Sequence, residues 1–402
     1  MNERPRVRLS NLALISIYIG LTGYGGPSLF GIMKEQFVEK KKWITEEEFL
    51  TGLSLAQMMP SAIAVNLIEF IGYKLRGTIG AVIASVCLMI PATIIMTVLG
   101  GLYFAYGQLS IIQSLFTGLG AVVIGLVVNA TITLGKSTIK DARSMLIAIM
   151  GFVIAYTTAG KSWSIILAVV LSGAAGILFY NRHQTPMQIE THQSRESRIS
   201  PRFIIAFAIV AFVFAGVLFV TRHSTTTMFI LSMLRVGAMT FGGGYMAIPL
   251  FQNEAVAVHH WLSNRDFLAG LALGQITPGP VLITSNFIGY KVLGVPGALL
   301  GSFVILLPGA VGMFFLSYQH EKVAHLTWVR AMVRGIVAGF IGVLATVIIR
   351  LASHSLFGWH SPLMVFKTTL VAAGTLLMLL VARKDPLWVV IGGIIVSLIL
   401  FR

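Results

Sequence analysis

The sequence predicts an all-α polytopic membrane protein made of two homologous halves, arranged as inverted repeats with broken helices. Two observations carry this prediction. Hydrophobic residues make up 56% of the 402-residue chain and charged residues only 11%, whereas soluble domains carry about 25% charged residues. A mean hydropathy of +0.87 agrees with this composition. In addition, one ordered set of glycine, proline and aromatic residues occurs twice along the chain.

Apolar stretches long enough to be membrane segments run through the whole chain. They lie at about residues 10–26, 49–73, 79–105, 109–134, 144–160, 163–180, 203–221, 226–250, 266–290, 296–318, 328–350, 364–382 and 386–401. The first is expected to be retained, because no small-x-small cleavage site follows it. We therefore expect an N-terminal transporter repeat at 1–180, a polar linker plus connecting membrane helix at 181–225, and a C-terminal transporter repeat at 226–402.

The two halves correspond with an offset of about 217 residues. The matching positions are Gly25-Gly26 with Gly242-Gly243, Trp43 with Trp261, Phe49-Leu50 with Phe267-Leu268, Gln57 and Pro60 with Gln275 and Pro278, and Gly72-Tyr73-Lys74 with Gly289-Tyr290-Lys291. So many identities in the same order predict an internal duplication. Two unrelated sets of glycine- and proline-rich helices are the alternative.

Six segments followed by one connecting helix would set the second half upside down relative to the first. Inverted repeats with broken helices at corresponding positions are typical of secondary transporters, whose site lies near the membrane midplane. With a cytoplasmic N-terminus, most basic loops fall inside, but Lys34 and Lys40 to Lys42 would fall outside. If segments 10–26 and 49–73 and their repeats are re-entrant hairpins, that loop returns to the cytoplasm. Both topologies stay open at this point.

Several function classes are disfavoured by the pattern. The net charge of +15 is spread over short loops between apolar runs, which indicates a topology signal and no nucleic-acid partner. Cys87 is the single cysteine, so neither a disulfide framework nor a cysteine metal site is expected. The histidines show no metal-ligand spacing, and we expect no cofactor. A membrane-embedded enzyme would need a catalytic constellation, and neither H-E-x-x-H nor Gly-x-Ser-x-Gly occurs.

Two glycine breaks interrupt apolar runs, at residues 22–27 and 240–245. Glycine allows positive φ and a close approach of backbone to a ligand, and free amides at a helix start attract anions. Helix packing is the alternative, and we assign to it the small-residue spacings at Gly297 and Gly301 and at Gly335 and Gly339. The candidate substrate-binding residues in the breaks are Gly25, Gly26, Pro27, Gly242, Gly243 and Gly244.

Two proline breaks follow at corresponding positions of the halves. Proline removes an amide donor and crowds the preceding turn, so regular helix ends there. Amide and hydroxyl side chains beside the breaks could bind an oxyanion or the freed backbone. The candidate residues are Gln57 and Pro60 in the first half, and Gln275, Thr277, Pro278, Gly279, Pro280 and Asn286 in the second.

Charged residues at membrane depth mark pathways or proton relays by default. Glu69 is the candidate coupling carboxylate, with an ion pair to Lys74 or Arg76 as the alternative. Lys74 and Lys291 are candidates for attracting an anion, although lysines near segment ends commonly extend to the interface. Glu35 and Glu254, just past the glycine breaks, are weaker acidic candidates.

Together, the glycine breaks, the Trp-x5-Phe-Leu runs, Gln-x-x-Pro, Thr277-Pro278-Gly279-Pro280 and the Gly-Tyr-Lys endings resemble the chromate ion transporter family in its long, two-domain form. The likeness is close over 272–294. The first half departs from the family pattern at Pro60-Ser61-Ala62, where Pro-Gly-Pro is usual, and at Phe30-Gly31, where a histidine is common. The resemblance implies export of chromate driven by the membrane potential or a proton gradient, with sulfate as a related substrate.

We therefore expect a multi-pass plasma-membrane protein with a cytoplasmic N-terminus that exports a tetrahedral oxyanion dianion. An importer or exchanger of sulfate or another oxyanion is the alternative within this class, and a channel or a lipid-modifying enzyme lies outside it. The expected partners are a small inorganic oxyanion, the lipid bilayer and, as one option for assembly, a second copy forming a homodimer.

Overall fold

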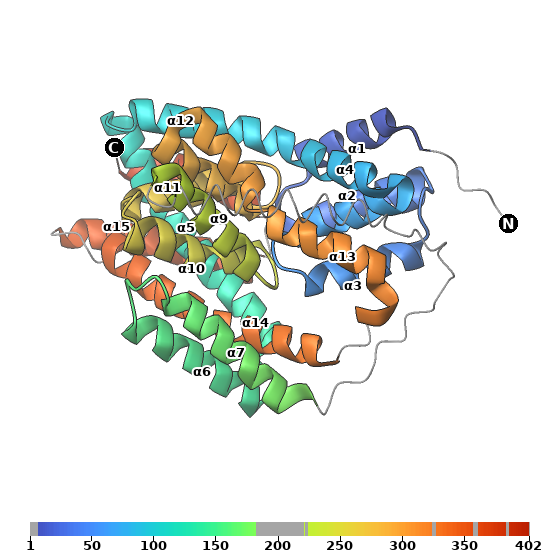
Figure 1. Cartoon of the computed structure of the whole chain (residues 1–402). Helices are drawn as coiled ribbons and strands as arrows, with labels where there is room; N and C mark the ends of the chain where they lie inside the picture. Colours follow the sequence, from blue (N-terminus) through green and yellow to red (C-terminus); the bar gives the residue numbers. More distant parts are fainter. Residues whose placement is uncertain are drawn as a thin grey trace.

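The computed structural model describes residues 7–181, 221, 224–323, 327–356, 361–382 and 386–401 (Figure 1). Within these ranges the regular elements are helices, which confirms the all-α class. Helices long and apolar enough to cross a membrane include α4 (Ile63–Tyr106), α5 (Ser110–Thr138), α14 (Thr327–Ser355) and α15 (Pro362–Leu380). The predicted connecting helix at 203–221 and most of the polar linker lie outside the described residues.

The first four helical pieces form two hairpins that share one end of the molecule, here called the first base. They are α1 (Leu9–Thr22), α2 (Gly25–Lys34) continued by the π-helix η1 (Glu35–Lys40), α3 (Glu46–Met58), and α4 up to Arg76. Arg76 Nη1 donates to the Val7 carbonyl at 3.0 Å, and Lys74 pairs with Glu48 at 2.9 Å. The starts of α1 and α3 therefore lie beside the end of the first part of α4, at the first base.

The tips of these hairpins lie away from the first base, at residues 23–24 and 59–62. Gly52 of α3 packs against Phe70 of α4 and Glu48 of α3 pairs with Lys74 of α4, so the two helices run antiparallel. The inward arms α1 and α3 have 14 and 13 residues, or about 20 Å each, which is about two thirds of the bilayer core. Segments 10–26 and 49–73 are interrupted midway by glycine and proline, as predicted. Of the two topologies left open by the sequence, their helices fold back on themselves as in the hairpin alternative.

A sharp kink at the first base turns α4 back on itself. Gly77 has φ 63° and ψ −154°, and a Cβ on Gly72 would overlap the Gly80 carbonyl on the returning segment. Positive φ is easily adopted by glycine. From Gly77 to Tyr106 the helix then continues for about 45 Å, enough to cross the bilayer core.

The second half repeats this pattern. Its hairpins are α9 (Thr225–Met239) with η3 (Gly244–Met246), α10 (Ala247–Phe251) and η4 (Gln252–Val258), then α11 (Asn264–Ile276) with η5 (Val281–Ile283) and α12 (Thr284–Val304) up to a kink at Gly294. Here too a π-helix precedes the turn between hairpins, and a capping box starts the next helix at Ser263 as at Thr45. The predicted segments 226–250 and 266–290 are therefore also hairpins and not single spans.

The two pairs of hairpins enter the molecule from opposite ends. The end of α4 far from the first base meets the second pair, where the Tyr103 hydroxyl donates to Asp266 Oδ1 at 2.7 Å and Lys291 lies 5.0 Å from the Phe104 ring centroid. We call this end, where α11 begins and the first part of α12 finishes, the second base. In Figure 1, α1 to α3 accordingly lie to the right, whereas α9 and α11 lie nearer the centre and left.

The remaining helices of each half pack mainly against helices of the other half. Helix α14 packs against α6 (Ala142–Thr157) and α7 (Ser164–Tyr180), while α5 packs against α15 and α16 (Pro386–Leu400). Small residues allow the contact: Gly335 lies on the Ser172 carbonyl of α7, and Gly342 on the Ala148 carbonyl of α6. Close backbone approach through small residues is the usual way membrane helices associate. The halves are therefore interlocked.

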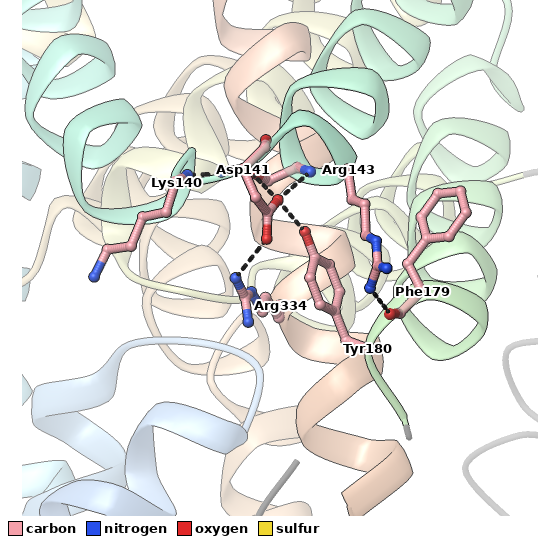
Figure 2. Close-up of polar contacts among 7 residues, drawn as sticks. Lys140, Asp141, Arg143, Phe179, Tyr180 and Arg334 are labelled. Carbon is pink, nitrogen blue, oxygen red and sulfur yellow. Dashed lines mark hydrogen bonds and ion pairs between the residues drawn. The ribbon is translucent and has the colours of Figure 1, made fainter. Parts of the chain in front are cut away.

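A polar cluster ties α6, α7 and α14 together near the start of α6 (Figure 2). Asp141 caps α6 by accepting from the Ser144 amide at 2.7 Å, and it also accepts from the Tyr180 hydroxyl at 2.6 Å. Arg334 of α14 pairs with its other oxygen at 3.2 Å and lies 3.9 Å from the Tyr180 ring centroid. The Tyr180 hydrogen bond above all, with those of Ser144 and the Arg334 charge, lowers the pKa of Asp141 to about 2.

Asp141→Asn is expected to destabilise the purified protein at pH 7 by on the order of 1 kcal/mol, a value reduced for the partial exposure of the carboxylate. A carboxylate with a lowered pKa in the folded state stabilises above its unfolded pKa, near 3.9, and loses this effect as pH falls towards 2. Thermal unfolding in detergent should show a difference in unfolding temperature between the wild type and Asp141→Asn, and this difference should shrink from pH 5 to pH 2. Glu47→Gln, at an exposed acid, is the control; a difference that persists at pH 2 would contradict the assignment.

Candidate functional site

The tips of the four hairpins meet at the middle of the molecule and exchange backbone hydrogen bonds between halves. The Ser61 amide donates to the Thr240 carbonyl at 2.7 Å, and the Gly279 amide donates to the Gly23 carbonyl at 2.8 Å. Tyr24 and Gly279 also form an isolated parallel bridge. Each proline break thus binds the glycine break of the other half. We call residues 23–26, 59–62, 240–244 and 277–280 the central crossing.

The sequence of the tips explains this irregular backbone. Gly242, Gly243 and Gly279 have φ of 82°, 119° and 112°, values that glycine adopts without the Cβ penalty. Ser61, which corresponds to Gly279, also has a positive φ of 79°, although a side chain there is strained by about 1 kcal/mol or more. Irregular backbone at membrane depth is tolerated only where protein or a water-filled cavity surrounds it. The crossing is therefore the candidate site.

Buried polar side chains flank the crossing from both halves. Asn66 Nδ2 donates to the Pro60 carbonyl at 2.9 Å, and Asn286 Nδ2 donates to Thr97 Oγ1 and Ser302 Oγ, both at 2.9 Å. Among the described residues, their Oδ1 atoms have no hydrogen-bond partner, and neither have Ser61 Oγ and Thr93 Oγ1. Leaving a buried polar atom unpaired costs about 1–3 kcal/mol. Such a group of unpaired atoms is suited to water, a proton or a transported ion.

Glu69 lies about one helical turn from Asn66 on α4 and is only 6% exposed. Its carboxylate contacts the Ser85 hydroxyl, and Oε2 has no partner in the described part of the chain. The alternative of an ion pair with Lys74 or Arg76 is not seen, because Lys74 pairs with Glu48 and Arg76 donates to Val7. Asn286 and Ser302 occupy the positions of Glu69 and Ser85 in the second half, so the same pair carries an acid in one half and an amide in the other.

Only some of the predicted binding residues lie at the crossing with polar groups free to bind a ligand. Gly25, Gly26 and Pro27 form the first turn of α2, and Gly244 starts η3 at the crossing. Gln275 is half-buried and its Oε1 accepts from the Tyr245 hydroxyl at 3.3 Å, whereas Gln57 is exposed at the end of α3. The Thr277 hydroxyl already donates to the Leu273 carbonyl at 2.8 Å, so it caps α11.

The two candidate lysines lie away from the crossing. Lys74 is at the first base, beside Glu48, and Lys291 is exposed at the second base, over Phe104. Each is separated from the tips by about 16 Å of helix. They therefore stand at opposite ends of the molecule, and a role in drawing an anion towards the site stays a prediction.

The weaker acidic candidates already have partners. Glu254 is buried against Arg235 at 2.8 Å and accepts from the Ser232 hydroxyl at 2.7 Å, while Glu35 pairs with Lys40 at 2.7 Å. Sequence reasoning missed Asn66, Thr93 and Ser302, which lie in apolar runs without a break. The only signal available for them was a polar residue among apolar ones.

Long apolar helices around a crossing of broken helices define a polytopic membrane protein with a buried polar site. The chain belongs to the chromate transporter family: the family model described as "Chromate transporter" matches residues 10–177 and again 226–398.

Three similar proteins align with this chain over most of its length. The chain is 29% identical to the chromate transport protein of Cupriavidus metallidurans, over 100% of this chain and 95% of that protein. It is 27% identical to the chromate transport protein of Pseudomonas aeruginosa, over 92% and 87%, and 28% identical to an uncharacterized transporter of Methanocaldococcus jannaschii, over 88% and 86%. No solved structure matches the chain.

Proposed function

We propose that this protein is a secondary transporter that exports chromate, a tetrahedral oxyanion dianion, across the plasma membrane. The observation that carries the proposal is the reciprocal pair of backbone hydrogen bonds at the central crossing, Ser61 to Thr240 and Gly279 to Gly23. It joins two sets of broken helices that enter from opposite ends. The names of the relatives from Cupriavidus metallidurans and Pseudomonas aeruginosa support chromate as the substrate.

The two halves would work as inverted repeats that rock around the crossing. Helices α2, α4, α10 and α12, with their short leading turns, all run outward from the crossing, so amide groups at their starts face a bound anion. The glycine tips let the backbone approach it closely, and the unpaired hydroxyls of Ser61 and Thr93 can donate to it. In this proposal Gln275 adds an amide from the second half, and Gln57 meets the anion at the exposed end of its pathway.

The charges of the first base support a cytoplasmic position for it and for the N-terminus. Lys34, Lys74 and Arg76 lie there together with Lys40 to Lys42, and positive residues near membrane segments stay inside. With re-entrant hairpins this whole loop would lie on the N-terminal side, and the charge conflict of the full-span topology would not arise. The second base then faces outward.

Energetics support export as the direction. Moving one charge through 100 mV is worth about 2.3 kcal/mol, so a dianion gains about 4.6 kcal/mol when it leaves a negative interior. At about 1.4 kcal/mol per tenfold, this sustains a gradient above a thousandfold without a coupled ion. Import of the same dianion would require cotransported cations to overcome this free energy.

Glu69 is the proposed site of proton coupling. Glu69→Gln removes a titratable group while keeping a side chain of similar size. We expect transport at a fixed membrane potential to lose its response to an imposed pH difference, while substrate binding remains. Vesicle flux under pH jumps measures this, with Glu47→Gln as the exposed-acid control. A variant that keeps the wild-type pH response would remove Glu69 from the coupling mechanism.

Retention of labelled chromate by intact cells tests the proposed function. Cells producing the protein should hold less chromate than cells producing an inserted but inactive variant, and a protonophore should abolish the difference. Greater retention of chromate or sulfate would instead support the alternative, an oxyanion importer. Equal retention, with the protein shown to be in the membrane, would contradict chromate export.

A further inference from the structure

A group of ionisable side chains lies outside the central crossing, at the second base. It joins α9, the inward arm of the first hairpin in the second half, to the end of the outward arm η4. Glu254 of η4 is only 2% exposed, and its two oxygens accept from Arg235 at 2.8 Å and from the Ser232 hydroxyl at 2.7 Å. His259 follows η4, and its Nε2 lies 3.2 Å from the Ser232 hydroxyl oxygen and 3.6 Å from Glu254 Oε2. We call these four residues the histidine cluster.

The hydrogen bonds of the histidine cluster show where a proton can be added. A carboxylate only accepts hydrogen bonds, so the single hydroxyl proton of Ser232 points towards Glu254. The Ser232 oxygen then accepts from His259, which places a proton on Nε2 and makes Nδ1 the atom that can take a further one. The His259 side chain is 23% exposed, so solvent can deliver that proton. A catalytic triad is a different arrangement, because its carboxylate bonds to the histidine and not to the serine.

Two neighbours favour the charged form of His259. The carboxylate of Glu254 is close enough to attract an imidazolium, and the Trp261 ring stacks on the imidazole with 4.3 Å between centroids and 8° between planes. A cation against the face of an indole ring is attracted by its electrons. Arg235 opposes the added charge, but it binds the other oxygen of Glu254. A proton on His259 therefore tightens the contact between α9 and the turn after η4.

The neighbouring elements bring few other titratable groups to this cluster. Helix α10 and residues 307–316 of α13 have none, and the adjacent His260 is exposed. Those on α11 and α12 have contacts elsewhere: Arg265 with Gln113, Asp266 with Tyr103, and Tyr290 and Lys291 with Phe104. The balance at His259 is thus set by Glu254, Arg235 and Trp261.

The corresponding turn of the first half has the same backbone but different chemistry. The Lys41 amide donates to the Gln36 carbonyl at 3.0 Å, as the His259 amide does to the Glu254 carbonyl at 3.1 Å. In both halves the next residue has a positive φ, 51° and 53°. Gln36 and Lys41 therefore occupy the positions of Glu254 and His259. Glutamine does not ionise and lysine stays charged well above pH 7, whereas histidine changes its charge between about pH 5 and 8.

We infer that His259, with Ser232 and Glu254, is a proton-binding site at the second base, distinct from Glu69, and that the bound proton holds the two arms of its hairpin together. That this site faces the outer solution rests on the proposed function. The first base has no counterpart at the corresponding turn, so the two ends of the protein respond differently to acid.

Aromatic contacts connect this site to the helix that leads to the crossing. Trp261 lies edge-on to Phe229 of α9, with 5.7 Å between ring centroids. The Phe229 ring in turn occupies the space beside Gly289 of α12, which is within one helical turn of Asn286. A proton on His259 therefore restrains α9 and α12 together, and acid at the outer face slows the movement of the second half.

Tryptophan fluorescence of the purified full-length protein between pH 8 and pH 5 tests the proton site, since a charged imidazolium stacked on Trp261 quenches the indole. The wild type should show a titration step that is lost in His259→Gln and in Trp261→Phe. Glu254→Gln should move the midpoint of this step down by about one pH unit. His260→Gln is the matched control, because this neighbouring histidine is exposed, and it should keep the step.

Potential-driven chromate flux in proteoliposomes tests the restraint on the hairpin. With equal pH on both sides, the ratio of His259→Gln flux to wild-type flux should rise about fivefold or more from pH 7.5 to pH 5.5, within the range of coupling between sites. Protonation of chromate or of Glu69 affects both proteins and cancels in the ratio. For His260→Gln the ratio should stay constant.

The outcomes separate this inference from the proposed function. A fluorescence step that persists in His259→Gln, or is absent from the wild type, would overturn the proton site. A flux ratio for His259→Gln that does not change with pH would overturn the restraint. If the step is present and depends on His259 but the purified protein carries no chromate, the proton site stands and chromate export fails.

Discussion

Gly279→Val is expected to abolish transport, by at least a hundredfold, in a protein that still inserts in the membrane. Gly279 has φ 112°, a conformation closed to β-branched residues, and a Cβ there would lie 3.0 Å from the Ala92 Cβ. The substitution would also displace the amide that bonds to the Gly23 carbonyl at 2.8 Å. The crossing between the halves would then lose one of its two reciprocal hydrogen bonds.

Gly294→Ala is the matched control for this prediction. Gly294 also has a positive φ, 66°, with ψ −149°, but no atom lies within 4 Å of an added Cβ, so the local backbone strain of about 1–3 kcal/mol applies without a clash. Chromate flux in vesicles, normalised to protein in the membrane, should stay within a few-fold of wild type for Gly294→Ala. Similar flux in both variants would show that the crossing does not carry substrate.

Gly342→Val is expected to lower the free energy of unfolding by about 4 kcal/mol or more, in the range that core overpacking and strain reach. A Cβ on Gly342 would overlap the Ala148 carbonyl of α6 and lie 2.6 Å from the Phe152 amide nitrogen. These are backbone atoms that cannot rotate away. The interlocked packing of α14 against α6 and α7 would have to open.

Gly374→Val on α15 is the control, since it places the same side chain where no atom lies within 4 Å. Thermal and denaturant unfolding of the detergent-purified proteins would compare the two. We expect Gly374→Val to unfold close to wild type and Gly342→Val to be recovered in low yield with a large loss of stability. Equal stability would mean that the exchange of helices between halves contributes little to the fold.

The broken helices were predictable from sequence because proline and glycine act locally. Helices α3 and α11 end at Met58 and Ile276, just before Pro60 and Pro278, because a proline disfavours helix in the residue that precedes it. The repetition of these prolines at an offset of about 217 residues placed both breaks. The choice between full spans and hairpins required tertiary contacts, such as Gly52 on Phe70 and Arg76 on Val7. The loop charges at Lys40 to Lys42 indicated a conflict but could not resolve it.

The sequence predicted which positions on a helix make contacts better than it predicted which helix they contact. The spacing of Gly335 and Gly339 predicted a helix contact, and both residues do lie against Ser172. Nothing in the spacing says that the partner belongs to the other half. In the same way, Asn66 and Asn286 acquire their meaning only when α4 and α12 are brought to the crossing, because a single amide in an apolar run has no local pattern.

Uptake of labelled chromate into proteoliposomes of purified protein tests the central claim most directly. With a potassium gradient and valinomycin setting the lumen positive, we expect chromate to accumulate with the potential, excess sulfate to compete, and Gly279→Val to show no uptake. At zero potential the wild type should not concentrate chromate. Absence of potential-driven uptake by folded wild-type protein, or equal uptake by Gly279→Val, would contradict a chromate exporter that works through the central crossing.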